Sequence, residues 1–148
     1  MHNALGIWRN IPTHLLQLGI AFVLALPVGW DQEKASGSAG LCTFSLVAVA
    51  SCGLVLLGIE VLGEDVQSQA RIIAGMIAGV GFIGGGAILN QGGSVHGTAT
   101  AASIWTVGII GTAVGYGYYD IGLVLAASNF LSLRVLRPLK RRFEADAE

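Results

Sequence analysis

Five long runs of uncharged, mostly apolar residues divide the chain. They cover residues 11–29, 41–62, 72–89, 99–115 and 121–136. A helix that crosses the hydrocarbon core of a bilayer needs about 20 such residues, and roughly 17 suffice. Each run therefore predicts one membrane-spanning helix, although Asn129 and Arg134 interrupt the last. Four or six spans are the alternatives to five.

Charged side chains collect between the runs. Asp31, Glu33 and Lys34 follow the first run, Glu64 and Asp65 the second, and Asp120 precedes the fifth. An ionised side chain at the bilayer centre costs at least about 2.5 kcal/mol, so spanning helices keep their charges at the ends. The pattern predicts an all-α membrane protein, a bundle of about five transmembrane helices over residues 1–137. Residues 138–148 are predicted to form a short charged cytoplasmic tail.

Lysine and arginine indicate the orientation of this bundle. The last helix ends in Arg134, Arg137, Lys140, Arg141 and Arg142. Cytoplasmic segments of membrane proteins carry an excess of these residues. The N-terminus is therefore expected outside and the C-terminus in the cytoplasm.

Composition agrees with a lipid environment and limits the function classes. Only 11% of the 148 residues are charged, against about 25% in soluble domains. The net charge of −1 gives no basic excess for nucleic acid. No His or Cys lies at metal-ligand spacing, and Ser103 and His96 are most of two helical turns apart with no base-orienting acid nearby. We therefore assign no metal, no cofactor and no catalytic residue.

Glycine is the most prominent feature of the third run. Residues 79–84 fit the dinucleotide-binding pattern GxGxxG. Such a loop must follow a strand and be followed by an acid about 20 residues later, whereas Ile104 and Trp105 occupy that place. A phosphate-binding turn inside an apolar run would also leave backbone groups without water. We reject the nucleotide interpretation.

Spacing gives these glycines another use, which is close packing of membrane helices. Glycines four residues apart lie on one helix face and let two backbones approach. The predicted helix-packing set is Gly75, Gly79, Gly81, Gly84, Gly85, Gly86, Gly111 and Gly115. Packing inside the bundle and self-association into a homodimer are both open. Three successive glycines also weaken a helix, so a bend or break is expected near Gly84, a feature of transport sites.

Several separated blocks of the sequence form one pattern. They are Arg71, then GVGFIGGGAI over residues 79–88, then VHGTATAASIW over residues 95–105, and the earlier stretch PVGWDQE over residues 27–33 followed by Ala39, Gly40, Leu41 and Thr43. In order and spacing these blocks resemble the MgtC/SapB family of bacterial inner-membrane proteins. The resemblance implies about five membrane helices. It also implies a role in adaptation to low magnesium, acid or related stress, exerted by binding and regulating other membrane proteins. Transport of a small ion such as magnesium is the alternative function.

This chain also departs from that family's pattern. Members usually carry arginine at the place of Cys42 and a basic residue at that of Gln32, so the first cytoplasmic loop is expected to have lost cationic groups. Many members carry a soluble C-terminal domain. This chain ends about a dozen residues after its last apolar run, and that domain is expected to be absent.

Two polar groupings are predicted at the ends of the helices. Asp31 and Glu33 end the first helix on the side where His96 precedes the fourth, so they form either one cytoplasmic cluster or two independent solvated loops. On the other side, Arg71 is expected to pair with Glu60 or Glu64, which would lower the cost of holding a charge at the hydrocarbon edge.

Overall fold

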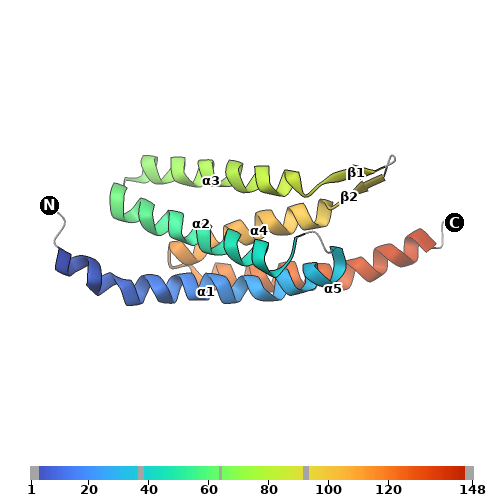
Figure 1. Ribbon diagram of the computed structural model, residues 1–148, viewed down its shortest axis with the longest axis horizontal. Coiled ribbons are helices and arrows are strands. Elements are labelled where there is room, and N and C mark those ends of the chain that lie inside the picture. The colour runs from blue at the N-terminus through green and yellow to red at the C-terminus, as the bar shows by residue number, and fades with distance from the viewer. Residues whose placement is uncertain (1–3, 37–38, 64, 92–93, 146–148) are drawn as a thin grey trace.

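Helices make up nearly all of the fold. The computed structural model describes residues 4–36, 39–63, 65–91 and 94–145. In these ranges it has five helices and one hairpin (Figure 1): α1 Ala4–Ser36, α2 Leu41–Leu62, α3 Val66–Gly86, β1 Leu89–Gln91, β2 Ser94–His96, α4 Thr98–Gly115 and α5 Tyr119–Ala145. All five helices are long and apolar enough to cross a membrane. The chain is a multi-pass membrane protein, and the prediction of five spans is confirmed.

Consecutive helices run antiparallel, and the bundle has three layers, with α3 in the top layer of Figure 1, α2 and α4 in the middle and α1 and α5 at the bottom. One end of the bundle holds the connection from α1 to α2, the β1–β2 hairpin and the C-terminal part of α5, and we call it the hairpin end. The other end holds the N-terminus and the α2–α3 and α4–α5 connections. The two termini lie at opposite ends, as an odd number of spans requires.

Helix α4 lies at the centre of the bundle because its small residues admit close neighbours. More than half of its span, 56%, is buried, against 11% for α3. A Cβ on Gly111 would clash with the Ala48 carbonyl of α2, and one on Gly115 would lie 2.7 Å from Cβ of Val55. The core forms around these contacts from residues such as Phe44, Ile104 and Ile110.

Two of the helices differ from the sequence-based expectations. Helix α1 continues through Asp31 and Lys34, which were expected in a linker. Helix α3 is continuous through Gly86, so the break expected near Gly84 is absent from this helix. Gly84 packs against the backbone of Ala101 in α4, at 3.1 Å from an ideal Cβ to its carbonyl oxygen. This tertiary contact outweighs the low helix propensity of successive glycines.

A short antiparallel hairpin between α3 and α4 was not expected. Its register pairs Leu89 with His96 and Gln91 with Ser94. Gly97 then begins α4 with a φ of +85°, and a Cβ there would clash with the Ala87 carbonyl. Only glycine meets both conditions without strain.

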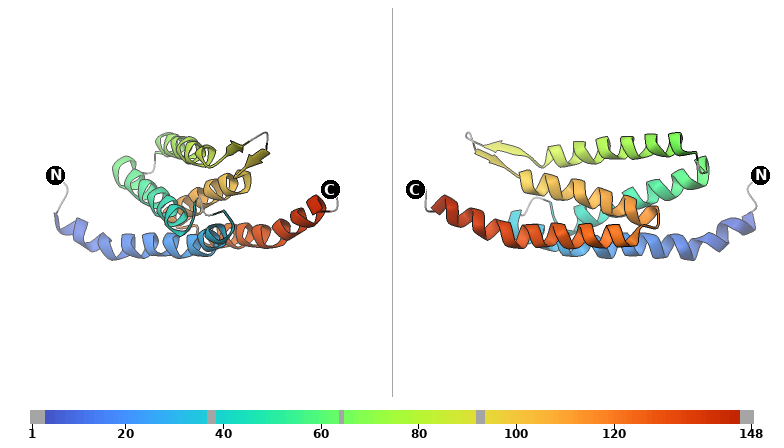
Figure 2. Two further views of the ribbon diagram at one scale, coloured as in Figure 1. Left: turned by 45° about the vertical axis from the view of Figure 1, so that its right-hand side comes forward. Right: turned by 180° about the vertical axis from the view of Figure 1, so that it is seen from behind.

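Helix α5 passes the predicted domain boundary at residue 137 and ends at Ala145. Figure 2 shows its last turns projecting beyond the bundle at the hairpin end.

Candidate functional site

A buried polar network joins α1, α4 and α5 near the hairpin end. Gln32 of α1 is fully buried and donates from Nε2 to Ser103 Oγ of α4 at 3.0 Å. Its Oε1 accepts from Thr100 Oγ1 at 3.2 Å. Ser103 in turn donates to Asn129 Oδ1 of α5 at 3.1 Å. Hydrogen bonds between membrane helices fix their register, so this network locks three helices at one level.

One donor of this network, the side-chain amide nitrogen of Asn129, lacks an acceptor among the described residues. This nitrogen, Nδ2, is buried. A buried donor without a partner costs about 1–3 kcal/mol. Among the described residues this amide donor is thus available to a further acceptor.

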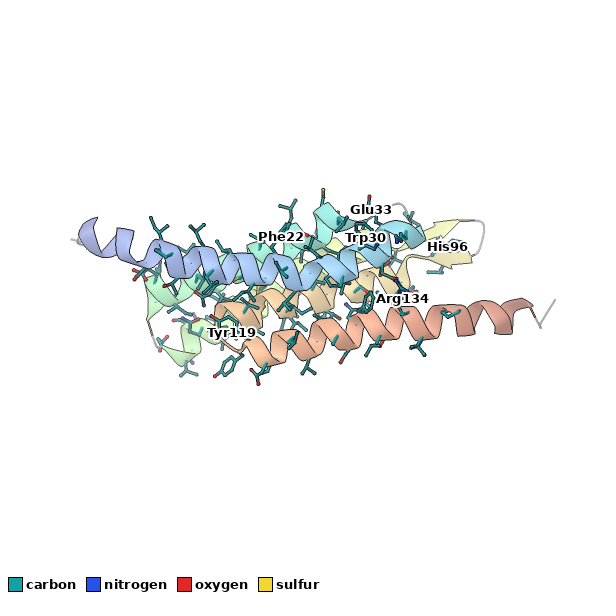
Figure 3. The ribbon with its side chains drawn as sticks, turned by 90° about the horizontal axis from the view of Figure 1, so that it is seen from below. Phe22, Trp30, Glu33, His96, Tyr119 and Arg134 are labelled. Carbon is teal, nitrogen blue, oxygen red and sulfur yellow. The ribbon has the colours of Figure 1, made fainter. Side chains whose placement is uncertain are left out.

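An ion pair joins α1 and α5 beside this network. Arg134 Nε of α5 is 3.4 Å from Asp31 Oδ1 of α1, and its guanidinium lies 5.4 Å from the ring centre of Phe130. Lys34 similarly covers the ring of Trp30 at 4.9 Å. Figure 3 shows Trp30, Glu33, Arg134 and His96 toward the same end of the molecule. Paired charges and aromatic rings at this level are what the edge of a hydrocarbon core requires.

The predicted cluster of Asp31, Glu33 and His96 is brought to one end but not into mutual contact. Glu33 accepts a hydrogen bond from the backbone N–H of Leu41 at 2.8 Å and so caps α2. Asp31 pairs with Arg134. His96 is exposed on β2. Each side chain of the trio thus belongs to a different part of the hairpin end.

The predicted pairing of Arg71 with Glu60 or Glu64 stays a prediction, because Glu64 lies outside the described residues. Within those ranges, Arg71 and Glu60 are both exposed and form no ion pair with each other. A neutral contact joins the helices at this end instead. Tyr116 donates to Gln69 Oε1 at 2.7 Å, Gln69 Nε2 donates to the Gly63 carbonyl at 3.0 Å, and burial raises the pKa of Tyr116.

Gln32 was expected in the first cytoplasmic loop, and the structure corrects this expectation. The residue lies inside α1 and is buried against α4. Cys42 is exposed in the first turn of α2. A change of residue at position 32 therefore alters the interior of the bundle, whereas one at position 42 alters its surface.

The predicted packing glycines fall into two groups. Gly84, Gly111 and Gly115 contact neighbouring helices of the chain, as described above. An ideal Cβ at any of the others would meet nothing within 4 Å: Gly75, Gly79, Gly81, Gly85 and Gly86. These five make no close contact inside the described bundle, because α3 lies in the outer layer and exposes them. Gly75 and Gly79, one helical turn apart, share one side of the helix, which we call the open glycine face of α3.

Two grooves run along the surface of the bundle. One, of about 410 Å³, separates α2 from α3 and is lined by Gly75 and Gly79 beside the exposed Leu46 and Leu54. The other, of about 550 Å³, separates α4 from α5 beside Ser103 and Asn129. Both are mainly apolar, with small residues where a larger side chain would fill the gap.

Sequence reasoning missed the polar residues of the network. Thr100, Ser103 and Asn129 were not proposed as a site, and Asn129 was noted only as an interruption of the last run. Polar side chains inside apolar runs are themselves a signal, since membrane helices place them toward one another. Their pairing spans 26 to 71 residues of sequence, which no local pattern shows.

The MgtC family profile matches residues 18–142, which is most of the chain. The chain belongs to the MgtC family. Relatives include protein SapB of Bacillus subtilis, 35% identical over 94% of this chain and 63% of its own length. Protein MgtC of Brucella abortus is 30% identical over 95% of this chain and 58% of its own. An uncharacterised protein of Synechocystis is 35% identical over 84% of this chain and 53% of its own.

This family member thus spans a little over half the length of several curated relatives. Protein SrpB of Synechococcus elongatus is matched over 80% of its length, at 30% identity. No solved structure matches.

Proposed function

We propose that this chain is a non-enzymatic protein of the bacterial inner membrane that regulates other membrane proteins in adaptation to low magnesium or a related stress. The open glycine face of α3 is the observation that supports this proposal. Small residues let a second helix approach so closely that it gains dispersion contacts that lipid does not match. The occupant proposed for this face is a transmembrane helix of another membrane protein.

The groove beside this face adds to the argument. Gly75 and Gly79 line it from α3, and the exposed side chains of Leu46 and Leu54 line it from α2. A helix seated on α3 would direct its side chains into this volume and cover both leucines. Packing of this kind, rather than removal from water, is what drives association between membrane helices.

Transport of a small ion is the second candidate, and the buried polar network is the observation that favours it. Polar groups within a membrane often mark an ion path. The hydroxyls of Thr100 and Ser103 and the amide oxygen of Asn129 are, however, engaged with Gln32 or with one another. The described residues also contain no group of three or more His, Cys, Asp or Glu side chains that could hold a metal ion.

Copurification tests the regulatory proposal with a matched control. The tagged wild type, a Gly75→Leu/Gly79→Leu variant and a Gly19→Leu variant are isolated from cells grown under magnesium limitation. Gly19 lies on α1, is exposed and also has nothing within 4 Å of an ideal Cβ, so it controls for the added leucine. We expect the α3 variant to lose a copurifying membrane protein and the growth phenotype, while Gly19→Leu keeps both.

Equal behaviour of the two variants would contradict the proposal. Ion flux through liposomes that contain only the purified wild-type protein would also contradict the regulatory proposal and would support the transport function instead.

A further inference from the structure

Two serines of α2 are buried without a hydrogen-bond partner. Ser45 is 5% exposed, and its hydroxyl is sealed inside the bundle with no partner among the described residues. Ser51 is 4% exposed and lines the groove between α2 and α3. Within the described part of the chain its hydroxyl makes no hydrogen bond, unlike those of Thr106 and Thr112, which each donate to a carbonyl of their own helix. A buried hydroxyl without a partner therefore lies on the wall of this groove.

The depth of Ser51 indicates what can reach it. The residue lies halfway along the 22 residues of membrane-spanning α2, which is bounded by Gly40 and Gly63. A phospholipid presents only hydrocarbon at the middle of a bilayer, and a hydroxyl that faces hydrocarbon keeps the cost of a missing hydrogen bond. A membrane helix can carry a polar side chain to the same level. Depth therefore favours a helix over a lipid as the occupant of this groove.

Ser51 also lies at the level of the open glycine face. Helices α2 and α3 run antiparallel, and a Cβ on Gly58 of α2 would clash with the side chain of Ile72 of α3. Seven residues along each helix from this contact lie Ser51 and Gly79. Gly75 and Gly79 line the same groove, and an ideal Cβ at either would meet nothing within 4 Å. A helix seated on these glycines thus passes beside the hydroxyl of Ser51.

We propose that the helix received by the open glycine face carries a serine, threonine, asparagine or glutamine at the level of Ser51, and that the Ser51 hydroxyl forms a hydrogen bond with this side chain. The inference rests on the proposed function and specifies the partner. The glycines determine how closely a helix approaches, and Ser51 determines which helix binds. The bundle itself uses such bonds, because Ser103 joins α4 to Gln32 of α1 and to Asn129 of α5.

The test uses the purified full chain in bilayer nanodiscs and two synthetic transmembrane peptides as probes. Both peptides are leucine-rich helices with alanines four residues apart, and they differ only in a central asparagine or leucine. Binding is measured by fluorescence energy transfer, and self-association of each peptide is measured separately without the chain. We expect the asparagine peptide to bind the wild type roughly three- to tenfold more tightly than the leucine peptide, as hydrogen bonds between membrane helices do.

Two serine variants locate the source of this preference. Ser51→Ala should bind both peptides equally. Ser45→Ala is the matched control, because it removes an equally buried hydroxyl without a partner from the same helix, away from the groove. It should keep the full preference. Neither substitution removes a hydrogen bond within the described chain, so both variants should unfold within a few degrees of the wild type.

The outcomes separate this inference from the proposed function. Equal binding of the two peptides by the wild type, or a preference that survives Ser51→Ala, would overturn the role of Ser51. Binding that is absent, or unchanged in Gly75→Leu/Gly79→Leu, would instead count against the docking face and so against the proposed function. A dimer of the chain itself that Ser51→Ala dissociates would also overturn the inference, because a second copy would then be the occupant.

Discussion

Helices α3 and α4 use the same residue type at the same spacing for opposite purposes. In α4, Gly111 and Gly115 are four residues apart and are both covered by α2. In α3, Gly75 and Gly79 have the same separation, yet an ideal Cβ at either position meets no other atom within 4 Å. Spacing determines which glycines share a helix face. Whether that face is covered depends on where the helix lies in the bundle.

This difference assigns separate consequences to the two helices. The small residues of α4 are required for the chain to fold, because another backbone occupies the space of the missing side chain. Those of α3 leave space that the described chain does not fill. Substitutions in α4 should therefore act on stability, and substitutions on the open glycine face should act on association.

The largest expected effect comes from Gly111→Leu. The new side chain would clash with the backbone of Ala48, which cannot move without displacing α2. Overpacking of this kind costs about 3 kcal/mol or more. Thermal unfolding in detergent should show a large loss of stability or no folded protein, and Gly79→Leu should unfold within a few degrees of the wild type. A Gly111→Leu variant as stable as Gly79→Leu would remove the distinction between the two helices.

A smaller loss is expected from Ser103→Ala in the interior of α4. It leaves the Gln32 amide and the Asn129 carbonyl oxygen without this partner. Hydrogen bonds between membrane helices contribute about 0.6 kcal/mol on average, and unsatisfied buried groups raise the cost toward 1–2 kcal/mol. The matched control is Thr106→Ala, whose hydroxyl bonds only the Ala102 carbonyl of its own helix. Equal stability of the two variants would show that the network does not hold the helices together.

The smallest effect concerns the exposed start of α3. Asp65 caps this helix by accepting from the Ser68 backbone N–H at 2.9 Å. Hydrogen bonds from the Ser68 side chain and backbone lower the pKa of Asp65 below its usual 3.8. The carboxylate therefore contributes stability above its unfolded pKa, and the contribution is lost as the pH falls through the folded pKa.

Asp65→Asn keeps an acceptor at the cap and removes the titration. We expect wild type to unfold at slightly higher temperature than this variant at neutral pH, with the difference vanishing below the lowered pKa. A difference that grows as the pH falls would contradict the role of the ionised cap.

The membrane spans could be predicted from the sequence because lipid imposes a local rule, that charges stay out of about 20 consecutive residues. This rule placed the end of the first helix too early, because the charges of Asp31 and Glu33 resemble those of a linker. Asp31 is accommodated by Arg134, which lies about a hundred residues away in the sequence. A local sequence pattern cannot show an ion-pair partner at that separation.

The hairpin was missed for a different reason. Gly92 and Gly93 between two short runs are a hairpin signal, but strands of three residues are too short to show alternation. The sequence also could not predict which glycines are covered by another helix, because their spacing carries no information on which helix lies opposite.

Photo-crosslinking from α3 tests most directly whether the open glycine face receives another membrane protein. A benzophenone amino acid replaces Phe82, which is 85% exposed on α3, and in a second variant replaces Leu15, which is 64% exposed on α1. In cells grown under magnesium limitation we expect Phe82 to give a discrete crosslink to one membrane protein, abolished by Gly75→Leu/Gly79→Leu, and Leu15 to give none. Crosslinks only to lipid from both positions would contradict the account.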